Sequence, residues 1–172
     1  IGRENEAETI EKYAEARKES MNKYYLTDDG IYLDYNMKTG GHSVILSAAS
    51  LYPYTFGVSD DKTGALKVLT RLELEYGLSA CEKRNDDMFY QWDYPCMWPA
   101  ATCLAYMGLK NIGLDYEATR IAGKYISVVR KVFEETGRLW EKYDALTGKI
   151  AETIEYETMP MMGWTAAVYR YF

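Results

Sequence analysis

The sequence is poor in residues that bind metals or form disulfides. Its 172 residues include one histidine, His42, and three cysteines, none of them in a CxxC pair. A structural zinc site needs about four His or Cys ligands, so no such site is expected. An odd number of separated cysteines predicts buried, inert thiols, which slightly favours a reducing compartment such as the cytoplasm.

The sequence also lacks a surplus of cations and a long apolar run. Its 20 Lys and Arg stand against 26 Asp and Glu, a net charge of −6. Nucleic-acid binding depends on clustered cations, so this class of partner is excluded. The longest stretch without charged residues, 39–59, is interrupted by glycine, proline and serine and is a poor membrane span. Residues 1–23 are densely charged and lack the apolar core of a signal peptide.

Aromatic side chains, by contrast, are abundant. Seventeen tyrosines and four tryptophans bring the aromatic fraction to 15%, within an apolar fraction of 48%. That apolar content is too high for a disordered chain, and the length suits a single domain. Aromatic residues build cores, and they also form platforms on which flat-faced ligands such as sugars and bases stack.

Six segments have the apolar spacing of helices. They are residues 5–25, 43–57, 60–76, 98–109, 115–136 and 160–171. The second and fourth contain no charged residue and the sixth has none before Arg170, whereas the other three carry charges on one face. Helices that are apolar all round are buried, and amphipathic ones lie at the surface. The alternation predicts an all-α fold, an α/α toroid made of three outer–inner helical hairpins.

The predicted loops alternate as well. Connections from inner to outer helices are short, whereas those from outer to inner helices are long, at 26–42, 78–97 and 137–159. Loops of this length are uncommon unless they have a function. All three lead to the N-termini of inner helices, so we expect them to gather on one face of the ring and to form the site there.

Three hairpins do not close a toroid of this kind. The charge-free inner helices would expose an apolar surface larger than a normal monomer patch. The chain is therefore either a piece of a larger barrel or a subunit that assembles with other chains. The absence of a Met before Ile1 favours the first reading. We expect the isolated chain to self-associate or to pair with the missing half.

The second long loop ends in QWDYPCMWPA, residues 91–100. A sugar pocket needs such a mixture of indoles and hydrogen-bonding groups, because a pyranose has apolar C–H faces and a hydroxyl rim. Taken alone, packed core aromatics explain the segment equally well. If it binds a sugar, the predicted contact residues are Gln91, Trp92, Asp93 and Trp98.

The third loop brings the carboxylates of Glu141, Asp144 and Glu155 toward the last predicted helix, which contains Trp164. Glycoside hydrolysis usually needs two carboxyl groups. On spacing alone, a solvated charged loop is the more frequent explanation. The first loop, with Asp34 among alternating apolar residues, is read mainly as a structural hairpin, although Asp34 could also hold an arginine or a ligand hydroxyl.

Four ordered motifs together resemble the trehalase family. QWDYPCMWPA is similar to the family signature Gln-Trp-Asp-x-Pro-x-Gly-Trp, which a Pro-containing pair follows. The other matching segments are GIYLDYN at 30–36, EKYD at 141–144, EY at 155–156 and GWT at 163–165. They stand in the family's order.

The resemblance implies an (α/α)6 barrel of which residues 1–172 form the C-terminal half. It also implies inverting hydrolysis of α,α-trehalose or a related α-glucoside, without a cofactor. Glu141 matches the family's general base, and Glu155 its sugar-binding glutamate, while Gln91, Trp92 and Asp93 match residues around the pocket. Trp98 and Trp164 complete the predicted substrate-binding set. No segment matches the family's general acid, so the isolated chain is expected to be inactive.

The chain also departs from the family pattern. Cys96 and Met97 replace an Asn and a Gly of the signature, residues 146–154 replace a glycine-rich lid, 159–162 replace a Gln-Asp-Gly-Phe stretch, and Ala166 replaces an Asn. Loss of glycines and polar groups changes what a pocket can hold. These changes motivate an alternative, a non-catalytic carbohydrate-binding or scaffold module on the same toroid fold. An isolated helical interaction domain is the third reading.

Overall fold

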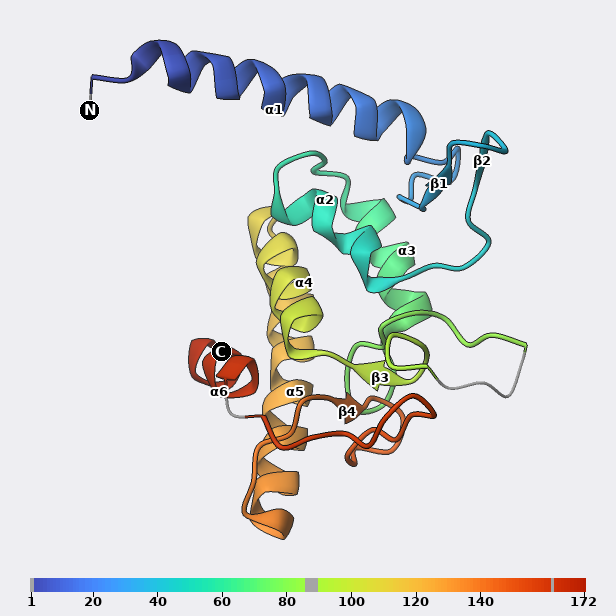
Figure 1. Cartoon of the computed structure of the whole chain (residues 1–172), viewed down its shortest axis with the longest axis vertical. Coiled ribbons are helices and arrows are strands. Elements are labelled where there is room, and N and C mark those ends of the chain that lie inside the picture. Colours follow the sequence, from blue (N-terminus) through green and yellow to red (C-terminus); the bar gives the residue numbers. More distant parts are fainter. Residues whose placement is uncertain (1, 86–89, 162) are drawn as a thin grey trace.

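The computed structural model describes residues 2–85, 90–161 and 163–172, and helices dominate it (Figure 1). The predicted all-α toroid class is confirmed, because the strands are pairs of only two residues. The elements are α1 (Glu4–Tyr24), β1 (Tyr35–Asn36), β2 (Gly41–His42), a 3-10 turn (Ala48–Leu51), α2 (Tyr52–Thr55), α3 (Lys62–Leu72), β3 (Cys96–Met97), α4 (Pro99–Asn111), α5 (Asp115–Thr136), β4 (Tyr143–Asp144) and α6 (Gly163–Tyr171).

The hairpin of α4 and α5 forms the centre of the molecule. Pro99 occupies the first turn of α4, where a missing N–H is tolerated. Helix α5 ends at Gly137, whose φ of 70° places it in the left-handed region that favours glycine. Helix α4 packs against both α5 and α2, and α6 contacts both α4 and α5 (Figure 1). This matches the alternation of inner and outer helices that the charge pattern predicts.

Helix α1 confirms the first predicted helix but contains no buried residue. The apolar residues Ile10 and Tyr13 in its N-terminal half are exposed. Figure 1 shows α1 at one end of the molecule, with its N-terminus pointing away from the α4–α5 pair. The apolar stripe is therefore uncovered over the N-terminal part of α1, whereas Tyr24 near its C-terminal end packs against Tyr35.

The second predicted helix, 43–57, is wrong at both ends. Only the 3-10 turn and α2 are helical, over residues 48–55. Residues 46–48 pair with 80–82: Ala48 donates to the carbonyl of Ala80, and Glu82 donates to the carbonyl of Leu46. Val44 and Ile45 lie in a bend just before this pairing, and the pairing overrides the helical spacing.

The third and sixth helices are shorter than predicted. Asp61 caps α3 by accepting from the N–H groups of Thr63 and Gly64, and a tight turn returns the chain at Gly77. Pro160 is not in the first turn of α6 but pairs with Trp140. Met161 likewise donates to the carbonyl of Leu139, so this segment is extended. Met162 lies outside the described residues.

Two of the three long loops meet, and the first does not join them. Strands β3 and β4 pair antiparallel, with Cys96 opposite Asp144 and Met97 opposite Tyr143. The first loop instead forms its own hairpin of β1 and β2 near α1 and α3 (Figure 1), as the structural reading of its sequence predicts. The prediction that all three long loops gather on one face is thus correct for the second and third loops only.

No helix among the described residues is long and apolar enough to cross a membrane.

Glu73 joins the end of α3 to α5. Its side chain is 10% exposed and lies 2.7 Å from Arg120 and 2.8 Å from Lys124. Burial opposes ionisation, but hydrogen bonds and charges from Arg120 and Lys124 outweigh it and hold the pKa of Glu73 below its ordinary value. A carboxyl with a lowered folded-state pKa stabilises the fold above its unfolded-state pKa, and that stability is lost as pH falls through the folded-state value.

We predict that Glu73→Gln lowers the free energy of unfolding by about 1–3 kcal/mol at neutral pH. The deficit should shrink in acid, because the wild-type protein loses the same contribution there. Urea denaturation at neutral and acid pH measures both effects, with the exposed neighbour Glu75→Gln as control. A deficit that does not change with pH would contradict this account.

Candidate active site

The pairing of β3 with β4 brings the two sequence motifs together. Trp98 follows β3 directly and precedes the first turn of α4, while Glu141 and Lys142 stand just before β4. The first turn of α6 docks on the same segment. Trp164 donates its indole N–H to the carbonyl of Glu141 at 3.2 Å, and Thr165 donates to the carbonyl of Trp140 at 2.6 Å. The candidate site therefore stands on three elements that fix one another.

Glu141 carries the carboxylate at the centre of this cluster. Its side chain is 13% exposed. Two donors reach the same oxygen, Oε2: the ammonium of Lys142 at 3.0 Å and the hydroxyl of Tyr156 at 2.5 Å. Hydrogen bonds to an ionised carboxylate are about twice as strong as neutral ones. The carboxylate is therefore held in one orientation.

Lys142 is fully buried, with 0% of its side chain exposed. Its Nζ lies 4.0 Å from the centre of the Tyr156 ring and 5.3 Å from that of Trp98. The negative faces of aromatic rings attract a cation, most strongly when water is excluded. The ammonium is thus accommodated by one carboxylate and two rings.

Tyr156 connects Glu141 to the second loop. Its hydroxyl lies 3.0 Å from the side-chain amide of Gln91. The neighbouring Glu155 accepts a hydrogen bond from the backbone N–H of Gln91 at 2.5 Å. Burial, together with the bond to Glu141 and the nearby carboxylate charges, raises the pKa of Tyr156, so the hydroxyl keeps its proton at neutral pH. Gln91, Glu141 and Glu155 therefore form one hydrogen-bonded group.

Three tryptophans surround this group. The rings of Trp92 and Trp98 are stacked, 4.1 Å apart and 10° from parallel, and Trp164 meets Trp98 edge-on at 5.3 Å. The indole N–H of Trp98 donates to the carbonyl of Gln91 at 2.6 Å. Trp98 is only 2% exposed, whereas Trp92 is 50% exposed. Trp92 is consequently the indole that offers a face to a ligand, and Trp98 supports it from below.

Asp93 is the one predicted residue that the structure does not bring to Glu141. Its carboxylate lies 3.6 Å from Arg84 and 3.4 Å from the backbone nitrogen of Tyr90. These contacts fold the second loop on itself. In this arrangement Asp93 shapes the loop that carries Gln91 and Trp92.

Sequence reasoning assigns no role to Lys142 and Tyr156. Both residues stand inside the matched motifs. Lys142 directly follows Glu141, and Tyr156 directly follows Glu155, the two glutamates to which the motifs do assign a role. The local sequence gives no signal of burial, because Lys142 stands in the charged run Glu141-Lys142-Tyr143-Asp144, and lysine is almost never fully buried without a partner.

The cysteines contribute no reactive group to the site. Burial raises the pKa of Cys96 to about 12, and it raises the pKa of Cys81 and Cys103 as well. All three thiols are free. Within residues 2–85, 90–161 and 163–172, no group of three or more His, Cys, Asp or Glu side chains could hold a metal ion.

These features define the class of the protein: a helical toroid whose loop face carries a fixed carboxylate beside stacked indoles. The comparisons identify the family within that class. The family model described as Trehalase matches residues 1–172, and the chain belongs to the trehalase family.

Individual relatives agree with this assignment. The chain is 30% identical over 167 residues to a "Probable trehalase" of Saccharomyces cerevisiae, covering 91% of this chain and 21% of that relative. The structure is similar to that of neutral trehalase Nth1 from S. cerevisiae, with a TM-score of 0.75, 28% identity and coverage of 93% of this chain and 29% of that one.

A more distant structure shares the fold alone. The GH63 mannosylglycerate hydrolase from Thermus thermophilus, solved in complex with glucose, aligns with a TM-score of 0.69 at 17% identity, over 90% of this chain and 36% of that one. The chain thus spans between about a fifth and about a third of the length of these relatives.

We predict that Trp98→Phe lowers the free energy of unfolding by about 1–3 kcal/mol, because it leaves the carbonyl of Gln91 without its donor. The matched variant Trp92→Phe, at the exposed ring of the stack, should change it by less than about 0.5 kcal/mol. Chemical denaturation of both variants measures the difference. Equal losses would contradict the supporting role of Trp98.

Proposed function

We propose that this chain supplies the C-terminal half of an (α/α)6 catalytic domain that hydrolyses α,α-trehalose or a related α-glucoside with inversion. The observation that carries the proposal is the Glu141 carboxylate, held by Lys142 and Tyr156 beside the stacked pair of Trp92 and Trp98. Membership of the trehalase family supplies the class of chemistry.

In this proposal Glu141 is the general base. Its carboxylate takes a proton from a water molecule, and the oxygen of that water attacks the anomeric carbon as the glycosidic bond breaks. An acid outside this chain protonates the leaving oxygen. Inverting enzymes place the two carboxyl groups roughly 6.5–9.5 Å apart, which leaves room for the water.

The remaining residues of the site would bind the sugar. The exposed face of Trp92 suits the C–H face of a pyranose. Gln91 and Glu155 stand beside it and offer amide and carboxylate groups to hydroxyls. Trp98 supports the ring of Trp92 from below. Trp164 packs edge-on against Trp98 and holds the backbone carbonyl of Glu141.

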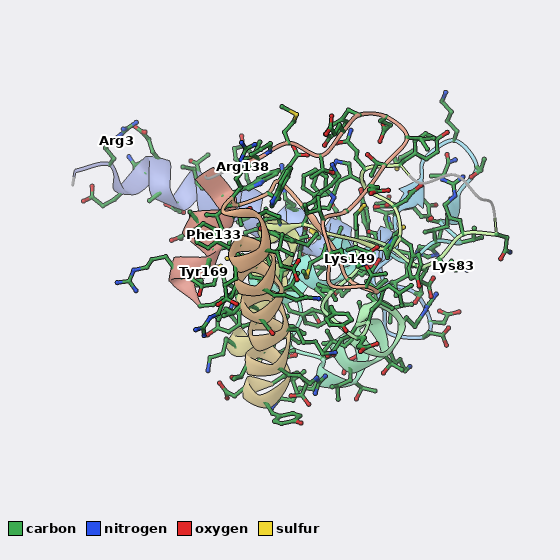
Figure 2. The ribbon with its side chains drawn as sticks, turned by 90° about the horizontal axis from the view of Figure 1, so that it is seen from below. Arg3, Lys83, Phe133, Arg138, Lys149 and Tyr169 are labelled. Carbon is green, nitrogen blue, oxygen red and sulfur yellow. The ribbon has the colours of Figure 1, made fainter. Side chains whose placement is uncertain are left out.

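Two exposed apolar surfaces support the half-barrel reading. One is the apolar stripe over the N-terminal part of α1. The other is a groove of about 560 Å³ between α5 and α6, where Phe133 and Tyr169 lie side by side (Figure 2). We propose that the remainder of the barrel covers such surfaces, and that the isolated chain is inactive and self-associates through them.

The alternative, a non-catalytic carbohydrate-binding or scaffold module, is motivated by the substitutions at Met97, Met161, Met162 and Ala166. Of these, Met162 lies outside the described residues, and Met161 pairs through its backbone N–H with the carbonyl of Leu139. Met97 is fully buried, and its sulfur packs so closely on Gly77 that a Cβ there would stand 2.1 Å away. Ala166 lines the groove between α5 and α6. The partners of the Glu141 carboxylate in this chain, Lys142 and Tyr156, are not among the substituted residues, which favours the enzyme. The reducing compartment suggested by the cysteines stays a prediction.

The direct test is Glu141→Gln in the full-length protein with trehalose as substrate. The amide cannot accept the proton from water, so we predict a fall in kcat of about 10³-fold. Glu152→Gln, an exposed glutamate of the same loop, is the matched control and should retain wild-type turnover. Near-wild-type kcat for Glu141→Gln would remove Glu141 from the base role, and sugar binding without turnover in the wild-type protein would favour the alternative.

A further inference from the structure

We propose that Lys142 and Tyr156 are positioning residues that hold Glu141 by its Oε2 atom and so leave Oε1 to take the proton from water. This inference rests on the proposed function, in which Glu141 is the general base.

The burial of Lys142 indicates that its positive charge is kept in order to pair with Glu141. An unpaired ammonium in a dry interior costs several kcal/mol, and buried lysines are therefore paired. The ion pair of Lys142 is with Glu141, and the faces of Tyr156 and Trp98 enclose the rest of its surroundings. A neutral side chain would fill the same space without this cost.

The local backbone is shaped so that this pair can form. Consecutive residues of an extended chain point to opposite faces, so neighbours such as Glu141 and Lys142 do not normally meet. Here the chain bends at Glu141 just before β4 begins. The backbone carbonyl of Glu141 is held by Trp164, and that of Lys142 accepts from Ala151. Both side chains therefore turn toward one point.

Tyr156 reaches the same oxygen from a separate loop. A tyrosine hydroxyl has one proton, and the shorter contact, 2.5 Å to Glu141 Oε2, assigns that proton to Glu141. The 3.0 Å contact with Gln91 is to its amide oxygen Oε1, which is also an acceptor, so Glu141 and Gln91 share this one donor and Glu141 lies closer to it. This chain of bonds orients Tyr156 and, through it, the carboxylate.

The two donors divide the roles of the carboxylate oxygens. Both bind Oε2, and no residue of the described part of the chain donates a hydrogen bond to Oε1. A base works only when its accepting atom points at the water within hydrogen-bond reach. An error of about 1 Å in such a position can lower a rate about 100-fold. Fixing Oε2 is thus a way to aim Oε1.

The test uses the full-length protein with trehalose and separates kcat from KM. Tyr156→Phe removes one donor but keeps the ring that covers Lys142, and Lys142→Met removes the charge at similar volume. The matched controls are Tyr76→Phe, a half-buried tyrosine, and Lys149→Met, an exposed lysine of the same loop. If Lys142→Met does not fold, Tyr156→Phe alone decides.

We expect each variant to lower kcat by about 10–100-fold with KM within about twofold of wild type. In the Glu141→Gln background the same changes should lower the residual turnover by less than about twofold, because they act through Glu141. Both controls should match wild type.

Unchanged kcat in Tyr156→Phe would overturn the inference, as would a change confined to KM. An equal loss in the Glu141→Gln background would do the same, because it would show a general structural effect. These outcomes differ from failure of the proposed function, in which Glu141→Gln itself would turn over like wild type.

Discussion

The burial of one ammonium group governs the architecture of this site. Lys142 is removed from water, so a carboxylate must lie close enough to balance its charge. Glu141 supplies that carboxylate, and the rings of Trp98 and Tyr156 supply the remaining attraction. These groups come from the second and third long loops, and the start of α6 holds the backbone of Glu141, so the arrangement forms only when all three segments are in place.

The helices hold in place the loops that carry these groups. The α4–α5 hairpin fixes the ends of the two loops, and β3 with β4 sets the register that puts Trp98 next to Lys142. The substitutions at Met97 and Ala166 fall in the core and on the outer groove. A chain can therefore change its packing at these positions while the group around Glu141 stays intact.

The sequence predicts the helices better than it predicts the contacts. Helix α5 is predicted at its observed bounds, because its charges mark one face and Gly137 ends it. Residues 43–47 are not helical, because Leu46 and Ser47 pair with residues some 35 positions away along the chain, beyond the reach of any local pattern. Glu141 and Trp92 come from motif resemblance, whereas the roles of Lys142 and Tyr156 depend on a bend and a loop closure that no spacing reveals.

The most direct test of the account is the configuration of the first glucose released by the full-length protein, followed by NMR before mutarotation. Attack by a water activated at Glu141 inverts one anomeric centre of α,α-trehalose and leaves the other as it was. The account predicts equal amounts of α- and β-glucose in the earliest spectra. Release of α-glucose alone would contradict it, since that result requires a covalent intermediate and assigns Glu141 a different role.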